Sequence, residues 1–212
     1  YEGMLDALRS NLSYLRRSRQ EYVVVADSHI VVNIDYQDML RQHVDSAADI
    51  TVLCRPRQHS VDADTPHIYF DLSENGTIER MEVAPDKTAL QYESLAIMIF
   101  RREQLINIVT QATAQGRHHI IRDVLQRAIN EKTLRVMGYR CPVPAWSIHS
   151  VRSYYRFNMD MLNSALRARL FDPSLPVYTK VRDDMPAYFS PEANVSGSLI
   201  ANGARVCGTV VN

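Results

Sequence analysis

A short apolar run that breaks into a polar turn is the feature that most constrains how this chain can fold. The stretch from Glu21 to Tyr36 reads EYVVVADSHIVVNIDY, and its polar turn falls at Ala26-Asp27-Ser28-His29. An apolar run of this length that ends in turn residues is typical of a buried strand. Where strands and helices alternate, ligands gather at the ends of strands, so this turn is the first place to expect a functional site.

Strands and helices alternate along most of the sequence. Apolar residues at helical spacing predict helices near residues 5–19, 35–44, 103–111 and 120–130, and apolar runs predict strands at 22–26, 49–55, 67–71, 77–83, 94–100 and 134–137. Asn75-Gly76 between two apolar runs predicts a hairpin, and the polar stretch 57–66 predicts a surface loop. This order favours an α/β fold with a mostly parallel sheet and helices on both faces.

The last third of the chain has a different pattern. Ser153 is expected to cap a helix that starts at Tyr154 and carries a long apolar stripe to Leu170. After Pro186, apolar residues recur every five or six positions among small residues, at Val195, Ile200, Val206 and Val211. This spacing matches a hexapeptide-type left-handed β-helix. About one coil is present, and because a solenoid needs neighbouring coils, we expect the chain to be a fragment that continues beyond Asn212.

The charge balance excludes several classes of partner. The 24 basic and 24 acidic residues give a formal net charge of +0, so nothing attracts the chain to nucleic acid or to an anionic membrane. No apolar stretch reaches the roughly 20 residues that a membrane helix needs, and we expect a cytoplasmic protein. The three cysteines, Cys54, Cys141 and Cys207, lack metal-binding spacing and are expected to be buried thiols. His43, on the inner side of its helix, is expected to be a hydrogen-bonded, half-buried histidine.

Several segments resemble the ADP-glucose pyrophosphorylases, also called glucose-1-phosphate adenylyltransferases. Residues 21–36 align without a gap with the family's EYVVILAGDHIYKMDY, residues 1–7 resemble Y-x-G-T-A-D-A, 94–100 resemble S-M-G-I-Y-I-F, and 158–160 match N-M-D. The resemblance implies a Rossmann-like nucleotidyltransferase domain at 1–153, a linking helix and loop at 154–185, and the start of a left-handed parallel β-helix at 186–212. The family's glycine-rich nucleotide loop, G-G-x-G-x-R, would precede Tyr1.

Such enzymes join glucose 1-phosphate to ATP with a magnesium ion that two aspartates hold. The resemblance puts His29 at the first aspartate and Ser147 at the second, from D-V-G-T, while the E-K-P segment that contacts the sugar phosphate becomes Val83-Ala84-Pro85. Imidazole and hydroxyl groups are poor replacements, because Mg²⁺ prefers charged oxygen ligands. We therefore expect no catalytic residue and no metal ligand here, with Mg²⁺ only in the family's active members.

A few residues keep the residue type that the family has, and Asp27 stands close to the position of the family's missing aspartate. Tyr1, Gly3 and Ser94 match the family and are expected to line a substrate pocket, whereas Ala96 and Met98 replace its glycine and tyrosine. Asp27 lies two residues before His29, which moves its carboxylate by about 7 Å along an extended strand. This shift is too large for Asp27 to hold the same ion.

Losses that concentrate on the charged centre predict a non-catalytic, regulatory subunit of the GlgD type. Such a subunit would form a hetero-oligomer, expected to be a tetramer, with a catalytic ADP-glucose pyrophosphorylase subunit and would shift its activity or its response to a sugar-phosphate effector. One alternative is a weakly active sugar-phosphate nucleotidyltransferase that uses His29 or Asp27. Another is a sugar-nucleotide binding module that works without a catalytic partner.

Overall fold

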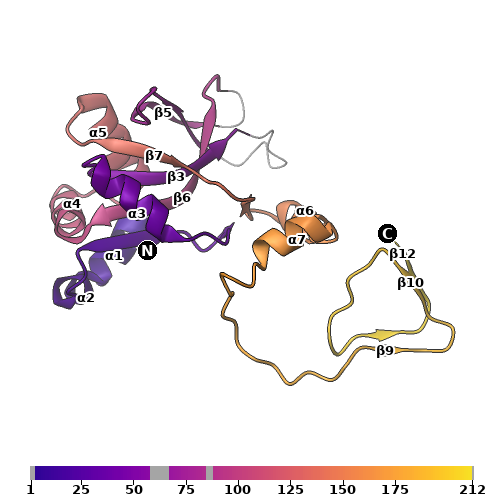
Figure 1. Ribbon diagram of the computed structural model, residues 1–212. Helices are drawn as coiled ribbons and strands as arrows, with labels where there is room; N and C mark the ends of the chain where they lie inside the picture. Colours follow the sequence, from indigo (N-terminus) through magenta and orange to yellow (C-terminus); the bar gives the residue numbers. More distant parts are fainter. Residues whose placement is uncertain (1–2, 58–66, 85–87, 212) are drawn as a thin grey trace.

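The computed structural model describes residues 3–57, 67–84 and 88–211, and a six-stranded sheet lies at its centre (Figure 1). Most of the predicted loop at 57–66, together with Tyr1 and Pro85, lies outside the described residues. The strand order is β5-β4-β6-β3-β7, and β1 also pairs with β6. The strands are β1 (Tyr22–Ala26), β3 (Ile50–Pro56), β4 (His67–Leu72), β5 (Ile78–Ala84), β6 (Tyr92–Arg101) and β7 (Val136–Arg140).

The predicted α/β class is confirmed, but the prediction of a mostly parallel sheet is wrong. Strand β6 lies between β1 and β3 and runs antiparallel to both. Within the described sheet, β3 and β7 are the pair that runs parallel. Strands β1 and β3 do point the same way, as the intervening helix predicts, but β6 follows the β4–β5 hairpin and enters between them. The alternation of strands and helices thus predicts the direction of a strand and not its neighbours.

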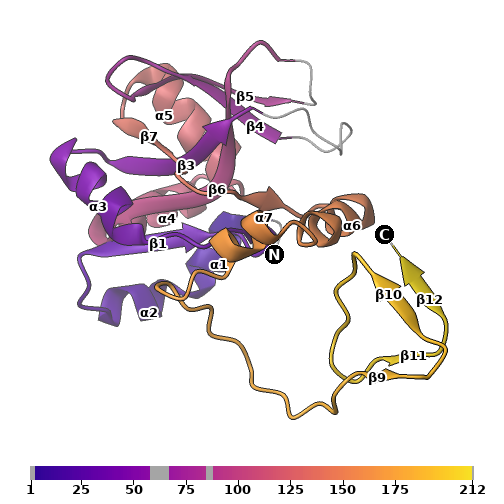
Figure 2. The same ribbon diagram turned by 45° about the vertical axis from the view of Figure 1, so that its right-hand side comes forward.

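Helices cover both faces of the sheet, as expected (Figure 2). Helix α3 (Tyr36–Asp45) packs its buried Met39 against Leu53 and Ile99 on one face. The other face carries the larger core, which a second group of helices covers with buried apolar residues such as Leu5, Leu105 and Val124. These helices are α1 (Met4–Ser10), α2 (Leu12–Arg17), α4 (Arg102–Ala114), the π-helix η1 (Ile121–Leu125) and α5 (Gln126–Glu131).

The long helix predicted after residue 153 is two shorter ones, α6 (Val151–Asp160) and α7 (Ser164–Leu170). Ser150 is the N-cap of α6, and Ser153 completes a capping box at the third helical position, so the predicted cap at Ser153 is wrong. Asn163 is the N-cap of α7, and its side chain accepts hydrogen bonds from the backbone nitrogens of Ala165 and Leu166. It interrupts the apolar stripe that the sequence predicted. None of the helices that the structure describes is long and apolar enough to cross a membrane.

Beyond α7, an extended segment leads to two pairs of short parallel strands. Strand β9 (Tyr188–Phe189) pairs with β11 (Arg205–Val206), and β10 (Asn194–Ser196) pairs with β12 (Thr209–Val211). Parallel strands stacked one coil apart are the element from which β-helices are built. The left-handed β-helix itself stays a prediction.

The cysteines differ from one another in burial. Cys54 lies in the core, and burial raises the pKa of its thiol to about 12. Cys141 is half-buried. Cys207 is exposed on the C-terminal coil, so the prediction of a buried thiol is wrong there.

Candidate functional site

The polar turn after β1 is joined to a distant part of the chain by a second small sheet. Strand β2 (Ile30–Val31) pairs antiparallel with β8 (Trp146–Ser147), with Ile30 opposite Ser147. Next to this ladder, the backbone nitrogen of Ile148 donates a 2.8 Å hydrogen bond to the carbonyl oxygen of His29. The ladder therefore brings His29 and Ser147 together, the two positions that the family resemblance assigns to magnesium.

Strand β8 is held in place by helix α6. The indole Nε1 of Trp146 donates a 2.9 Å hydrogen bond to the Oδ2 atom of Asp160. The Trp146 ring also packs edge-on against Phe157, with the ring centroids 5.4 Å apart. Asp160 belongs to the N-M-D segment, so one of its roles in this chain is to position the strand that carries Ser147.

Three imidazoles lie in a row beside the ladder, and we call His29, His149 and His67 the histidine row. The ring centroids of His29 and His149 are 4.2 Å apart, and those of His149 and His67 are 5.2 Å apart. At its far end, His67 pairs with Ala84 in the β4–β5 ladder. Positions 29, 84 and 147, three of the four where the chain departs from the family's charged residues, therefore lie around this row, and the fourth is the neighbouring Val83.

A buried ion pair supports the His67 end of the row. Glu93 is 3% exposed, its Oε1 atom lies 3.1 Å from Nδ1 of His67, and its Oε2 atom accepts a 2.9 Å hydrogen bond from Nε of Arg55. Burial opposes the charge of Glu93, but its bonds with His67 and Arg55 prevail and lower the pKa of the carboxyl group. Glu93 is therefore a carboxylate at neutral pH, and it fixes the orientation of His67.

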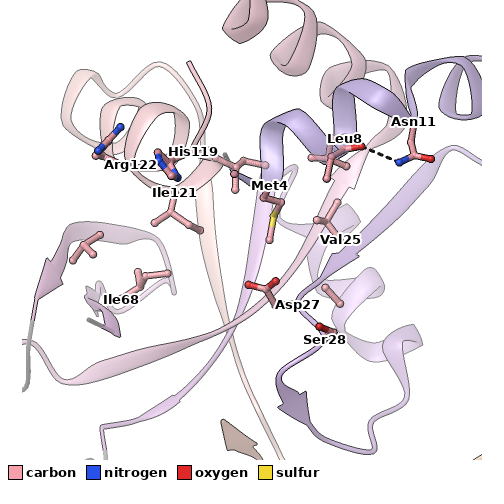
Figure 3. A pocket seen from close by; sticks show the side chains of 15 residues that line it. Met4, Leu8, Asn11, Val25, Asp27, Ser28, Ile68, His119, Ile121 and Arg122 are labelled. Carbon is pink, nitrogen blue, oxygen red and sulfur yellow. Dashed lines mark hydrogen bonds between the residues drawn. The ribbon is translucent and has the colours of Figure 1, made fainter. Parts of the chain in front are cut away.

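A cavity of about 800 Å³ opens on the other side of the turn (Figure 3). Met4 from α1, Val25 from β1 and Asp27 from the turn lie along one side of it, and Ile121 and Arg122 of η1 lie across from them. Its walls combine apolar surface with a carboxylate and a guanidinium group. A cavity of this size and lining is suited to a small organic molecule that carries charge.

The predicted substrate residues have distinct positions. Gly3 lines the cavity, and a Cβ atom there would lie 2.3 Å from the carbonyl oxygen of His118, so the close approach of two backbones requires glycine. Ser94 is not among the residues that line the cavity, and its Oγ atom accepts a 3.1 Å hydrogen bond from the backbone nitrogen of Ala96. Tyr1 lies outside the described residues. The substrate-binding roles of these three residues stay predictions.

The donor groups at the ladder do not fit a magnesium ion. His29 offers imidazole and Ser147 a neutral hydroxyl, and Asp27 is the nearby carboxylate, 3.7 Å from Nδ1 of His29 and 43% exposed. In the part of the chain that the structure describes, no three histidine, cysteine or acidic side chains are placed to hold a metal ion. Because Mg²⁺ requires nearly octahedral oxygen ligands, these residues cannot replace a pair of aspartates.

The sequence analysis did not assign a role in the site to four residues, namely His149, His67, Glu93 and Arg55. His149 stands two residues after Ser147, a spacing that keeps both on one side of an extended segment, so the pattern contained a usable signal. His67, Glu93 and Arg55 come from three different strands. Their meeting depends on the antiparallel insertion of β6, which the sequence did not predict.

The fold and the ladder define a nucleotidyltransferase scaffold, and the comparison with known families agrees. The chain belongs to the nucleotidyl transferase family, which matches residues 1–164. It is similar to the glucose-1-phosphate adenylyltransferase of Thermomicrobium roseum, with 29% identity over 97% of this chain and 48% of the relative. The enzyme of the same name from Geobacillus stearothermophilus is also 29% identical, over 99% of this chain and 54% of the relative.

A third relative carries a different name. The glycogen biosynthesis protein GlgD of Bacillus subtilis is 26% identical over 99% of this chain and 50% of its own length. The chain thus spans about half the length of the curated relatives that it matches. Overall identity to the adenylyltransferases and to GlgD is similar, so the choice between them depends on the residues at the ladder.

Proposed function

We propose that this chain is part of a regulatory, catalytically impaired subunit of glucose-1-phosphate adenylyltransferase in glycogen biosynthesis. The observation that carries the proposal is the β2–β8 ladder, which brings His29 and Ser147 together without an aspartate at either position. The scaffold is kept, and the charges that would align and neutralise a triphosphate are gone. Transfer of a nucleotidyl group depends mainly on that neutralisation.

The proposed role is exerted on a partner. The subunit would assemble with a catalytic glucose-1-phosphate adenylyltransferase subunit, as a hetero-oligomer of tetrameric type, and alter its rate or its response to a sugar-phosphate effector. The cavity of about 800 Å³, with Asp27 and Arg122 on its walls, is a suitable place for such an effector. A ligand changes a partner's activity only if its affinity differs between two states of the assembly.

The test is pyrophosphorolysis of ADP-glucose by the full-length protein, alone and mixed with the catalytic subunit of its organism. We expect no turnover by the protein alone, and a changed rate or effector response in the mixture. Size-exclusion chromatography of the same mixture should show a joint assembly. Robust turnover by the protein alone would contradict the proposal.

A second candidate function is weak nucleotidyl transfer that depends on Asp27, whose carboxylate projects into the cavity (Figure 3). In that case the purified protein turns over slowly by itself, and Asp27→Asn abolishes the activity. A third candidate is a sugar-nucleotide binding module that acts without a catalytic partner. It predicts ligand binding by the isolated protein and no effect on the adenylyltransferase in the mixture.

A further inference from the structure

We infer that the cavity selects a sugar phosphate that also carries an amino group, with Asp27 binding the ammonium group and Arg122 the phosphate. The two side chains come from the polar turn and from η1 and line opposite sides of the cavity (Figure 3). A ligand with one positive and one negative end matches this arrangement, because each end meets the opposite charge. The inference rests on the proposed function for the sugar-phosphate class of the effector, and it adds the group that distinguishes one such effector from another.

Asp27 supplies a carboxylate that no lysine or arginine of the described residues neutralises. Its side chain is 43% exposed, and its Oδ2 atom lies 3.7 Å from Nδ1 of His29, which is beyond hydrogen-bond distance. The backbone nitrogen of Asp27 is bonded to the carbonyl oxygen of Ala96, so the turn that carries the carboxylate is fixed. The ammonium group of a ligand can therefore bind this carboxylate by charge-assisted hydrogen bonds.

Arg122 supplies a guanidinium group that is held in place and still has donors to offer. Its Nε atom donates a 2.9 Å hydrogen bond to Oδ1 of Asp123. Hydrogen bonds from the backbone nitrogen of His119, from Arg122 and from the backbone nitrogen of His118 lower the pKa of Asp123 to about 2, so this carboxyl group is ionised at neutral pH. The two terminal nitrogens of the guanidinium group have no partner among the described residues and can bind two phosphate oxygens.

The balance of charge limits the ligand to a single phosphate. Asp123 offsets part of the positive charge of Arg122, and Asp27 repels any further anion. A nucleoside triphosphate would bring several negative charges to a cavity whose described lining includes one arginine and no lysine. The apolar side chains of Met4 and Val25 are left for the C–H face of a sugar ring.

Isothermal titration of the full-length protein without a partner subunit tests the inference. The probes are glucosamine 6-phosphate, glucose 6-phosphate, which lacks the ammonium group, and glucosamine, which lacks the phosphate. We expect glucosamine 6-phosphate to bind at least about tenfold more tightly than either of the other two, because each missing group removes charge-assisted hydrogen bonds.

Two variants and two matched controls assign the two ends of the ligand. Asp27→Asn should bind the two sugar phosphates with equal affinity, and Arg122→Gln should bind glucosamine 6-phosphate no more tightly than glucosamine. Asp183→Asn and Arg182→Gln change exposed charges outside the cavity lining and should keep the original preference.

Three results would each overturn the inference. They are no binding of glucosamine 6-phosphate, equal affinity of the original protein for the two sugar phosphates, and an unchanged preference in either folded cavity variant. If no probe binds while the protein still changes the rate of the catalytic subunit, the inference fails and the proposed function stands. The expected preference without any effect on the catalytic subunit would contradict the regulatory role and leave the inference in place.

Discussion

The backbone nitrogen of Asp27 donates a 3.1 Å hydrogen bond to the carbonyl oxygen of Ala96, and Ala96 itself has a φ of +50°. The residue lies in the part of β6 where its register with β3 shifts, which marks a β-bulge. A left-handed conformation costs a residue with a Cβ atom about 1–2 kcal/mol. Alanine stands where the resemblance places the family's glycine, so the chain carries strain at the point where β6 supports the candidate site.

Replacing Ala96 by glycine should raise the free energy of unfolding by about 0–1 kcal/mol. Relief of the strain is partly offset by the loss of a buried methyl group, which is worth about 0.8 kcal/mol. The measurement is urea denaturation followed by circular dichroism. Ala128→Gly is the matched control, because Ala128 is buried in the right-handed helix α5 and its replacement should cost about 1 kcal/mol or more. Equal losses in the two variants would show that Ala96 is not strained.

Removing the charge of Glu93 should destabilise the protein strongly. In Glu93→Gln, Arg55 keeps its buried positive charge without a carboxylate partner, and breaking such a pair costs about 3–5 kcal/mol. Denaturant unfolding measures the loss. Glu131→Gln removes an exposed carboxylate whose Oε1 lies 2.6 Å from Nε of Arg127 and should change stability by less than about 1 kcal/mol. A loss in Glu93→Gln no larger than in this control would show that the buried pair contributes little.

The local elements were predictable from the sequence because their signals are local. The hairpin at Asn75-Gly76 forms as expected, with Gly76 at a φ of +83°, and the strand predicted at 94–100 is buried as β6 (Tyr92–Arg101). His43 is hydrogen-bonded as expected, although it is fully buried rather than half-buried. Each of these features was predicted from a pattern of residues that are close together in the sequence.

The features that the sequence did not reveal depend on long-range pairing. Strands β2 and β8 have two residues each, which is too short for a periodic pattern, and their pairing is what joins His29 to the segment of His149. The meeting of Glu93 with Arg55 and His67 likewise requires the strand order of the sheet. The resemblance singled out positions 29 and 147, which the β2–β8 ladder brings near each other, but the histidine row around them could be seen only in three dimensions.

The buried His43 should make stability fall as the pH is lowered. Its Nδ1 atom lies 2.8 Å from Oγ1 of Thr51, and burial, followed by the positive charge of Arg101, lowers the pKa of the imidazole. The unfolded chain takes up a proton near pH 6.5, whereas folded His43 does so only at lower pH. Its contribution is therefore fully present above about pH 6.5 and is lost as the pH falls below that value.

Unfolding measured between about pH 5 and pH 7 tests this dependence. His43→Gln keeps a hydrogen-bonding group near Thr51 but does not titrate, so the slope of stability against pH should become shallower. His119→Gln removes an exposed imidazole and should keep the original slope. Parallel profiles for the original protein and His43→Gln would exclude His43 as the source of the pH dependence.

Restoring the two carboxylates should restore magnesium binding. Ile30 is opposite Ser147 in the β2–β8 ladder and His29 is the residue before Ile30, so the double variant His29→Asp, Ser147→Asp puts one hard oxygen ligand on each of two adjacent strands, one residue out of register. We expect this variant to bind Mn²⁺ and Mg²⁺ in titrations monitored by electron paramagnetic resonance, where the original protein does not. The variant His29→Asp, Ser147→Asn has the same shape with one charge fewer and should bind at least about tenfold more weakly, because Mg²⁺ depends on ligand charge. If the two double variants bind equally, the ladder does not hold positions 29 and 147 close enough to share one ion.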